Sequence, residues 1–344
     1  MRVALVYDLR DDYRALGLSE EAVAEFDSIE TIDQLAAALE ALHCEVVRVG
    51  RGQMLAARFV AGERYDLVFS IAEGVKGRSR EAQVPALCEL FDQPYLFSDP
   101  LTMAASLDKT VAKRLVRDAG VKTPAFAVAD GATNELSDWA DFPAFVKPVA
   151  EGTGKGVTAA SKIHKHSELV KVCRHLLMKY NQPVLVETFM PGREFTVGIV
   201  GSGKDAWAIG ALEVTLNEDA ETDVYSYLNK EKCEELVKYV LVDDAAARKA
   251  CKVALKAWRG LGCLDAGRVD LRADRHGNPN FIEVNPLAGL HPKHSDLPIL
   301  CAQVGISYRG LIGMIMESAL KRIDRSKFKA RSKKSSAEKS RAYK

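Results

Sequence analysis

The sequence predicts a mixed fold that begins with an α/β domain built on a parallel sheet and continues with α+β segments. Three observations carry this prediction. Strand-like and helix-like runs alternate over the first third of the chain, and strand-like runs dominate after about residue 120. A turn rich in Gly, Asn and Pro around Gly277 then joins two strand-like runs into an antiparallel hairpin.

The first third consists of strand–helix–strand units. Residues 2–8 and 44–50 are strand-like, and residues 28–43 between them have the apolar spacing of an amphipathic helix. A third strand over 65–74 runs into the polar loop "EGVKGRSREAQ" at 73–83. Such units favour a parallel sheet with right-handed crossovers, in which ligands gather at the carboxyl ends of strands. The loop is therefore either part of a site or a solvated surface loop, and composition leaves both interpretations open.

The rest of the chain has fewer helices. Residues 99–120 are predicted to be helical up to Gly120, because a glycine followed by a nearby proline is a helix-stop signal. Strands follow over 143–160 and 183–201, separated by a helix near 167–180. The last section contains strands at 206–214, 266–274 and 279–286, and helices at 244–262 and 308–323.

Composition and charge exclude few classes of protein but point away from several. With 344 residues the chain has room for two or three domains, and a formal charge of +1 does not call for nucleic acid or an anionic membrane. We expect no membrane span and no signal peptide. The cysteines at 44, 88, 173, 233, 251, 263 and 301 are odd in number and never spaced C-x-x-C. Reduced thiols in a cytoplasmic protein are therefore expected.

The charge is concentrated at the C-terminus. Residues 324–344 hold nine Lys or Arg and two acidic residues, so this tail carries +7 and the remainder carries 1 − 7 = −6. Without apolar periodicity the tail is predicted to be disordered. A basic arm for nucleic acid or an acidic partner is an alternative interpretation, but a solvated tail is favoured.

The predicted hairpin carries a group of oxygen donors. Residues two apart on a strand share a face, and folding the hairpin can bring Asp270 alongside Glu283 and Asn285. Two carboxylates and one carboxamide suit Mg²⁺, which shares its coordination with substrate phosphates. Arg268 lies two residues before Asp270, where it can hold the charge of a phosphoryl transfer or tetrahedral intermediate. The alternative is a pair of exposed strand ends with ordinary polar residues.

Two further stretches suggest a nucleotide. In "FVKPVAEGTGKGV", Lys147 ends an apolar strand and the glycines 152, 154 and 156 follow, so that backbone N–H groups could approach phosphate oxygens. This is not a Walker A loop, and a flexible loop is the alternative. In "PVLVETFMPGREFTVGIV", Glu187 and Glu194 could accept hydrogen bonds from an adenine amino group and from ribose hydroxyls, or could form salt bridges at a strand end.

Taken together and in this order, the motifs resemble the ATP-grasp superfamily and, within it, the D-alanine–D-alanine ligase family. The matching stretches are "LDKTVAKRLVRDAGVKTPAF", "FVKPVAEGTGKGV", "VETFMPGREFTVGI" and "GRVDLRADRHGNPNFIEVNPLAGL", and the resemblance covers about residues 1–320. It implies an N-terminal parallel-sheet domain and two α+β ATP-grasp subdomains. The implied divisions are 1–104 for the N-terminal domain, 105–194 for the central lid, 195–323 for the C-terminal subdomain and 324–344 for the tail.

The resemblance also implies roles for individual residues. ATP would lie between the two subdomains, with Lys109 and Lys147 on its phosphates and residues 152–156 as a lid. Thr153 stands at the place of the family's catalytic-loop serine. Glu187 would meet the adenine amino group, Glu194 the ribose and Met190 the base. Two Mg²⁺ ions, or Mn²⁺ in their place, would be held by Asp270, Glu283 and Asn285. Arg268 would stabilise charge while a carboxylate is phosphorylated and an amine then displaces phosphate.

The chain departs from the family in its substrate loops. Glu73 replaces the family's histidine, and Arg78 with Ser79 replaces two acidic residues. Arg78 and Arg80 would add positive charge near the first substrate, which favours an anionic substrate. The alternative is that one of these arginines pairs with Glu73 or Glu81.

Three more substrate-side assignments follow from the resemblance. Asp27 is the best match for the glutamate that binds the first amino acid's ammonium, and Ser295 for the contact to the second substrate's carboxylate. The stretch "DVYSYLNKEK" resembles the family's flexible loop and makes Lys230 a catalytic candidate, although the family's substrate-side tyrosine falls on Glu231.

We therefore predict an ATP-dependent carbon–nitrogen ligase that makes an amide between small amino-acid-like substrates. A D-alanine–D-alanine ligase in the strict sense is a weaker interpretation, given the departures above. Two alternatives stay open: a nucleotide-binding regulatory protein without ligation, and a small-molecule kinase that performs only the phosphorylation. Family similarity also implies a homodimer formed through the N-terminal section, with no role for a membrane.

Overall fold

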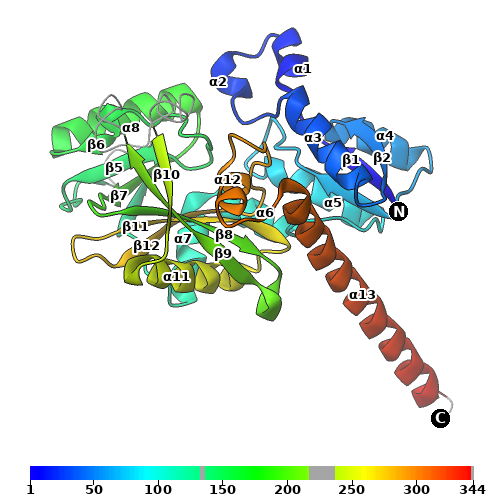
Figure 1. Cartoon of the computed structure of the whole chain (residues 1–344). Coiled ribbons are helices and arrows are strands. Elements are labelled where there is room, and N and C mark those ends of the chain that lie inside the picture. Colours follow the sequence, from blue (N-terminus) through cyan, green and yellow to red (C-terminus); the bar gives the residue numbers. More distant parts are fainter. Residues whose placement is uncertain (132–135, 217–236, 342–344) are drawn as a thin grey trace.

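Three sheets follow one another along the chain, as Figure 1 shows for the whole molecule. The computed structural model describes residues 1–131, 136–216 and 237–341, and for 325–341 the backbone alone. The first sheet has the strand order β2-β1-β3, the second β4-β7-β5-β6 and the third β10-β9-β8-β11-β12. The first is parallel and the other two are antiparallel, which confirms the predicted fold class.

The N-terminal sheet is buried on both faces. Its strands are β1 (Arg2–Val6), β2 (Glu45–Gly50) and β3 (Leu67–Ser70). Side chains alternate along a strand, so Val3 and Leu5 enter a core shared with α3 (Ile29–Glu40), whereas Ala4 and Val6 enter one shared with α4 (Gly52–Val60) and α5 (Gln83–Leu90). The short helices α1 (Arg10–Ala15), α2 (Glu20–Val23) and η1 (Arg80–Ala82) lie in the connections.

The predicted helix over 99–120 is two helices, α6 (Pro100–Leu107) and α7 (Lys109–Asp118). Asp108 breaks it, with an extended ψ of 100°, and its carboxylate accepts hydrogen bonds from the backbone N–H groups of Thr110 and Val111. An N-terminal cap of this kind starts a new helix. Lys109 is therefore the first residue of α7, where its position is fixed by the cap.

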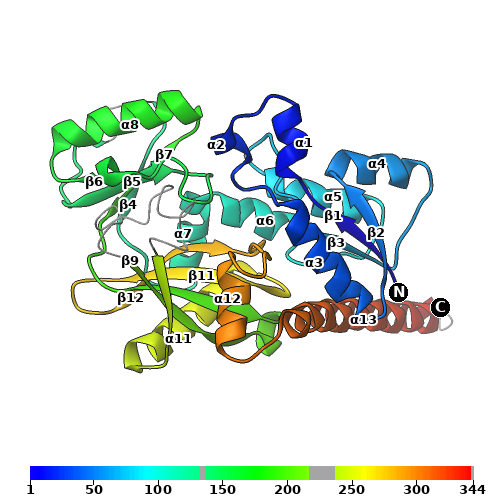
Figure 2. The same ribbon diagram turned by 45° about the horizontal axis from the view of Figure 1, so that its top comes forward.

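The second sheet lies under one long helix. Its strands are β4 (Phe126–Ala129), β5 (Ala144–Pro148), β6 (Lys162–Ile163) and β7 (Val184–Thr188). Helix α8 (His166–Tyr180) covers this sheet through Leu169, Cys173 and Leu176. Figure 2 shows α8 on the outer side of the sheet.

The third sheet carries the predicted hairpin. Its strands are β8 (Glu194–Val200), β9 (Trp207–Leu216), β10 (Val237–Val242), β11 (Ala266–Ala273) and β12 (Pro279–Asn285), and helices α11 (Ala245–Leu261) and α12 (Asp296–Gln303) pack against them. Helix α7 packs here too, since Ala112 and Val116 share a core with Trp258 of α11. The sequence assigned that helix to the central subdomain.

Helix α13 (Tyr308–Arg341) ends the described chain and projects from the body (Figures 1 and 2). The sequence predicted disorder from residue 324, whereas the backbone stays helical to Arg341. Residues 325–341 contain neither Gly nor Pro, and eight of these seventeen residues are Lys or Arg, which have high helix propensity. That propensity outweighs the lack of an apolar face in this structure.

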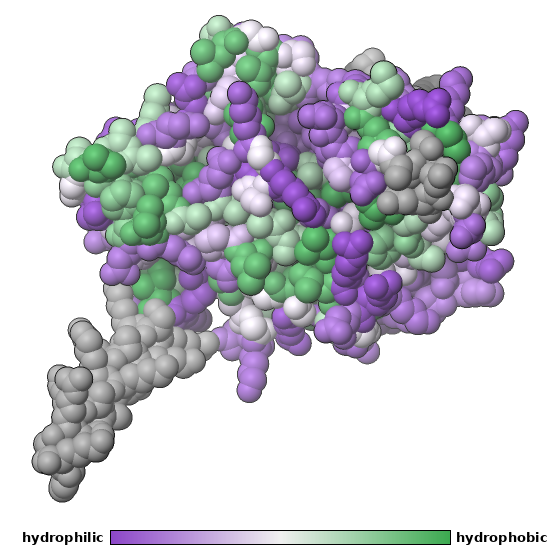
Figure 3. Space-filling view, turned by 180° about the vertical axis from the view of Figure 1, so that it is seen from behind, coloured by the Kyte–Doolittle hydropathy of each residue, from purple (hydrophilic) through white to green (hydrophobic). Residues whose placement is uncertain are grey.

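The surface of the molecule is chemically mixed. Seen from behind, hydrophobic residues form small groups among hydrophilic ones (Figure 3). No single helix within the described residues is long and apolar enough to cross a membrane, although α12 and the first part of α13, bent by 112°, meet the length and composition test as a pair.

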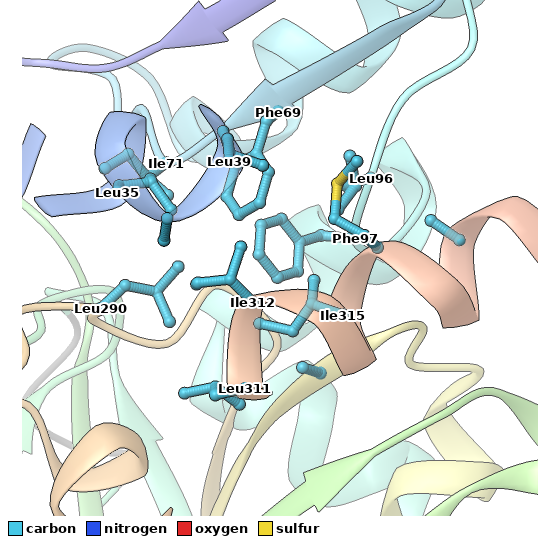
Figure 4. Close-up of a cluster of buried hydrophobic side chains, with 14 of the residues drawn as sticks. Leu35, Leu39, Phe69, Ile71, Leu96, Phe97, Leu290, Leu311, Ile312 and Ile315 are labelled. Atoms are coloured by element: carbon cyan, nitrogen blue, oxygen red, sulfur yellow. The ribbon is translucent and has the colours of Figure 1, made fainter. Parts of the chain in front are cut away.

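The root of α13 is anchored in the N-terminal core. Figure 4 shows Ile312 and Ile315 of α13 facing Leu39, Phe69 and Phe97. The rings of Phe69 and Phe97 meet edge to face at 5.4 Å between centroids. One core thus joins the N-terminal sheet, the third sheet and the last helix, and it fixes the position of the site between them.

Candidate active site

Two adjoining cavities lie where the three sheets meet. The larger has a volume of about 520 Å³ and is lined by the N-terminal and third-sheet regions. The smaller has a volume of about 120 Å³ and lies between the second and third sheets. Residues lining both are Lys109, Glu151, Gly152, Arg268 and Glu283. A group bound in one cavity would therefore touch a group bound in the other through these shared residues.

Most residues singled out in the sequence line these cavities. The larger cavity is lined by Asp27, Glu73, Lys109, Gly152, Thr153, Arg268, Glu283, Asn285 and Ser295. The smaller is lined by Lys109, Lys147, Gly152, Gly154, Glu187, Met190, Glu194, Arg268, Asp270 and Glu283. Neither lining includes Arg78, Arg80 or Gly156, and Lys230 lies outside the described residues.

The hairpin of β11 and β12 brings the predicted oxygen donors together. Asp270 stands opposite Glu283, and Arg268 opposite Asn285. The Asn285 side-chain Nδ2 lies 3.2 Å from Asp270 Oδ2, and the Thr196 hydroxyl donates to Asp270 Oδ1 at 2.9 Å. No cluster of three His, Cys, Asp or Glu suited to a metal occurs in the described part of the chain, so the third ligand would be the Asn285 carboxamide. This donor set is one that Mg²⁺ and Mn²⁺ accept.

Arg268 links both cavities. Its guanidinium pairs with Asp296 at the start of α12, and one of its nitrogens lies 3.6 Å from Asp270 Oδ2. The side chain is 12 % exposed, so its charge acts in a partly desolvated site. Asp296 was not predicted. It follows Ser295 directly, and an acidic residue in the first turn of a helix is the only signal the sequence offered.

A buried pair of lysines holds Glu187. Lys113 Nζ lies 2.7 Å from Glu187 Oε2, and Lys147 Nζ lies 3.4 Å from Oε1. Although burial acts to raise it, the two lysines hold the pKa of Glu187 below its usual value. Glu187 also lines the smaller cavity, and its predicted contact with adenine stays a prediction. Lys113 was missed, yet it lies four residues after Lys109 on the same face of α7.

Glu283 faces two of the predicted phosphate-binding cations. Its Oε2 lies 3.7 Å from Lys109 Nζ and 3.5 Å from Lys147 Nζ. Burial acts to lower the pKa of Lys147, but Glu187 and Glu283 together raise it above its usual value. Lys147 is therefore charged at neutral pH, and both lysines stand beside the oxygen donors of the hairpin.

The glycine-containing loop has the features of a phosphate cradle. Thr153 has a left-handed φ of 48°, which is uncommon for a threonine, and its Oγ1 is buried with no hydrogen-bond partner among the described residues. Gly154 also has a positive φ, of 70°. Gly156 serves the turn instead: its φ is 75°, and an added Cβ would lie 2.6 Å from Pro148 Cγ.

Glu25 connects this loop to the N-terminal domain, and the sequence did not single it out. The backbone N–H of Gly152 donates to Glu25 Oε1 at 2.5 Å, and Arg80 donates to Oε2 at 2.8 Å. Lys155 Nζ lies 3.5 Å from the same Oε2. Glu25 thus joins the loop to a segment that precedes it in the chain by more than a hundred residues.

The far end of the smaller cavity is more apolar. Met190, Phe145 and Phe189 line it together with Glu194. Arg272 lies 3.5 Å from Glu194 Oε2 and stacks over Phe189 at 5.0 Å from the ring centroid. An apolar slot that ends in a carboxylate suits a flat base attached to a sugar.

Acidic residues dominate the N-terminal wall of the larger cavity. Burial raises the pKa of Asp27 to about 7 and, chiefly by the same cause, the pKa of Glu81 to about 7. Burial and the nearby Glu81 raise the pKa of Glu73 well above its usual value. The sequence predicted Asp27 and Glu73 at the substrate together with added positive charge from Arg78 and Arg80, and neither arginine lines this cavity.

The predicted roles of Arg78 and Arg80 are also corrected. Arg78 donates to Asp108 Oδ2 at 2.9 Å and 2.5 Å, with a side chain that is 72 % exposed. Arg80 is buried and donates to Glu25 and to the Ala150 carbonyl. Carboxylates on distant elements neutralise both guanidinium groups, and these pairings depend on the fold. Ser295 stays in the larger cavity, where its Oγ accepts from the His291 N–H at 3.0 Å.

Comparison with known proteins gives a consistent result. A family model described as D-ala D-ala ligase C-terminus matches residues 115–317. The chain is 32 % identical to a D-alanine–D-alanine ligase from Bordetella petrii over 76 % of this chain and 78 % of that protein. It is 31 % identical to a D-alanine–D-alanine ligase from Aquifex aeolicus, over 84 % of this chain and 94 % of that protein.

Solved structures agree on the fold. The D-alanine–D-alanine ligase from Bacillus anthracis, crystallised with ATP, matches with a TM-score of 0.72 at 21 % identity, covering 95 % of this chain and 99 % of that one. The VanG D-Ala:D-Ser ligase from Enterococcus faecalis matches with a TM-score of 0.69 at 19 % identity, over 92 % and 99 %. Two ligases whose names give different substrates thus share the fold, so the fold does not fix the substrate.

Proposed function

The chain belongs to the D-alanine–D-alanine ligase family of ATP-dependent carbon–nitrogen ligases and has the ATP-grasp fold, and on this premise we propose that it joins the carboxylate of one small amino-acid-like substrate to the amine of another. ATP would activate the carboxylate as an acylphosphate. We further propose that the substrates are not two D-alanine molecules, because Glu73, Arg78 and Ser79 replace the residues that the family has in this loop.

One observation carries the proposal: Lys109, Arg268 and Glu283 line both cavities. A γ-phosphate bound in the smaller cavity would meet a carboxylate bound in the larger one beside these three residues. Positioning of this kind is the main contribution a protein makes to phosphoryl transfer.

The reaction would proceed in two steps. A carboxylate oxygen attacks the γ-phosphorus, and the bond to the β-γ bridging oxygen breaks with its electron pair leaving on ADP. The amine lone pair then attacks the carbonyl carbon of the acylphosphate, phosphate leaves with its bonding pair, and the nitrogen gives up a proton. Arg268 would donate hydrogen bonds to the negative oxygens of both steps.

Other residues would bind the nucleotide. Lys109 and Lys147 would contact the phosphates, and the Thr153 hydroxyl and loop N–H groups would close over them. Asp270, Glu283 and Asn285 would hold Mg²⁺ or Mn²⁺, which neutralises phosphate charge when bound. We assign Met190 to the base and Glu194 to the ribose. We also infer a cytoplasmic location, where ATP is abundant and the six described cysteines can remain free thiols.

The volume of the smaller cavity adds a requirement. About 120 Å³ is well below the roughly 300–1,000 Å³ of cavities that enclose a small-molecule ligand. The glycine-containing loop, which forms one wall, would move outward to admit ATP. We propose this loop as the lid of the site.

Phosphate release from MgATP tests the function. The purified protein would be incubated with pooled L- and D-amino acids, and products would be identified by mass spectrometry. One ADP per amide bond would establish ligation. A phosphorylated substrate without an amide would mean a kinase, and tight ATP binding without turnover in any pool would favour a regulatory protein.

A further inference from the structure

We propose that one of the two substrates is an amino acid whose side chain carries a cationic group, an ammonium or a guanidinium, and that Glu73 and Glu81 hold that group. The inference rests on the proposed function and adds a substrate class to it. It also replaces the anionic substrate that the arginines of this loop had suggested.

The two carboxyl groups share one position in the cavity wall. Glu73 lies three residues after β3, at the carboxyl end of the parallel sheet, and Glu81 lies in η1. Both line the larger cavity, and they lie close enough for Glu81 to raise the pKa of Glu73. Burial raises the pKa of both carboxyl groups, so a cation that binds beside them would displace a proton.

Charge pairing sets these two residues, together with Asp27, apart from Glu25, Asp296 and Glu283 in the same cavity. Glu25 has Arg80 and Lys155, Asp296 has Arg268, and Glu283 has Lys109 and Lys147. Across the described ranges of the chain, neither Glu73 nor Glu81 forms an ion pair with a side chain of the protein. Arg80 and Lys109 are near enough to influence the pKa of Glu81, but both are already engaged with other carboxylates.

The wall offers more negative charge than an ordinary amino acid needs. One α-ammonium requires one carboxylate, and Asp27 on the same wall can supply it. Glu73 and Glu81 then remain as a second anionic site. Their raised pKa values agree, because burial favours the neutral form of both groups until a cation arrives, and the charge of Glu81 adds to this for Glu73.

The cavity has room for a longer substrate. Its volume of about 520 Å³ falls inside the range of roughly 300–1,000 Å³ found for sites that enclose drug-sized ligands. Two alanine-sized substrates would leave much of it unfilled. An aliphatic side chain of three or four carbons ending in a cation fits both the space and the charge.

The test compares cationic amino acids with their uncharged counterparts. Binding of lysine and norleucine, ornithine and norvaline, and glutamate, each as L- and D-forms, would be measured by calorimetry with MgADP present. Lysine or ornithine should bind at least tenfold more tightly than the matched uncharged amino acid. Repeating the titration at about pH 6.5 in buffers of different ionisation enthalpy should show proton release on binding.

Variants of Glu73 and Glu81 test whether these two residues cause the preference for a cationic amino acid. Glu73→Gln and Glu81→Gln should each reduce the preference for the cationic amino acid to below about threefold and abolish the proton release. Glu40→Gln, an exposed residue at the end of α3, is the matched control and should leave both unchanged. Thermal melting of each variant checks that it is folded, and the wild-type comparison stands even where a variant is not.

The outcomes separate this inference from the proposed function. Equal binding of lysine and norleucine, tighter binding of glutamate, or no binding of any amino acid would overturn the inference. Phosphate release with the same panel decides ligation independently. Selective binding of a cationic amino acid with no phosphate release would refute the ligase and support the binding site, whereas release with neutral amino acids alone would do the reverse.

Discussion

The two walls of the larger cavity use acidic residues in opposite ways. On the C-terminal wall, Glu283 and Asp296 lie beside Lys109, Lys147 or Arg268, so each negative charge is matched within the protein. On the N-terminal wall, burial raises the pKa of Glu73 and Glu81, and neither forms an ion pair among the described residues. Under the proposed function, the matched wall would bind the nucleotide phosphates and the metal, and the unmatched wall is where a cationic substrate would complete the charge.

The largest effect is expected on the matched wall. Asp270→Asn removes a negative charge from the oxygen donors and should lower kcat on the order of 10³-fold, because a metal contributes several kcal/mol to a phosphoryl transfer. Phosphate release measures this loss. Asp118→Asn, at the exposed end of α7, is the control, and both variants should melt like the wild type. Near-normal turnover of Asp270→Asn would remove the metal assignment.

The buried charges of the same wall should be costly to break. Lys113 is fully buried, and Lys113→Met would leave Glu187 with Lys147 alone, so we expect a loss of about 3–5 kcal/mol in the free energy of unfolding. Urea denaturation measures the change. Lys249→Met, which removes an exposed lysine on α11, should cost less than about 0.5 kcal/mol. Equal losses for the two variants would mean that the pair is not desolvated.

Glu81 on the unmatched wall should make the stability of the protein depend on pH. The pKa of Glu81 rises from its usual 4.5 to about 7, so the folded protein binds this proton more tightly than the unfolded chain does. Stability from this group is therefore present below pH 4.5 and is lost as pH rises toward 7.

Glu81→Gln should reduce this loss of unfolding free energy with rising pH. Relative to the wild type, the variant should gain about 1–2 kcal/mol in unfolding free energy between pH 4.5 and 7.5. Denaturation at several pH values measures this gain, with Glu40→Gln as the control. If the unfolding free energies of wild type and Glu81→Gln change in parallel with pH, the Glu81 carboxyl group is hydrated and its pKa is not raised by burial.

The smallest effect is expected outside both walls. Arg78 reaches Asp108 from an exposed position, so Arg78→Ala should cost about 0.5–1 kcal/mol in stability. The KM values of ATP and of the amino acids should change less than twofold. A selective rise in one amino-acid KM, measured by steady-state kinetics, would return Arg78 to the substrate site.

Local pattern predicted the hairpin site, and only the fold revealed its partners. The alternation of β11 and β12 placed Asp270 opposite Glu283 because strand periodicity and a two-strand turn suffice for that. The role of Glu25 was not predicted, because its partners Arg80 and Gly152 are 55 and 127 residues away in the chain. The break at Asp108 could have been predicted, because an Asp directly before an amphipathic run indicates the N-terminal cap of a helix.

Glu25 also sets a thermodynamic cost for the nucleotide. Its carboxylate accepts the Gly152 N–H, a donor that under the proposed function belongs to a phosphate oxygen. Glu25 would therefore compete with a phosphate oxygen for the Gly152 N–H of the lid. Apparent ATP affinity is the intrinsic affinity multiplied by the fraction of molecules in which this contact is open. Because linkage is reciprocal, any substrate that draws Glu25 away would strengthen ATP binding by the same factor.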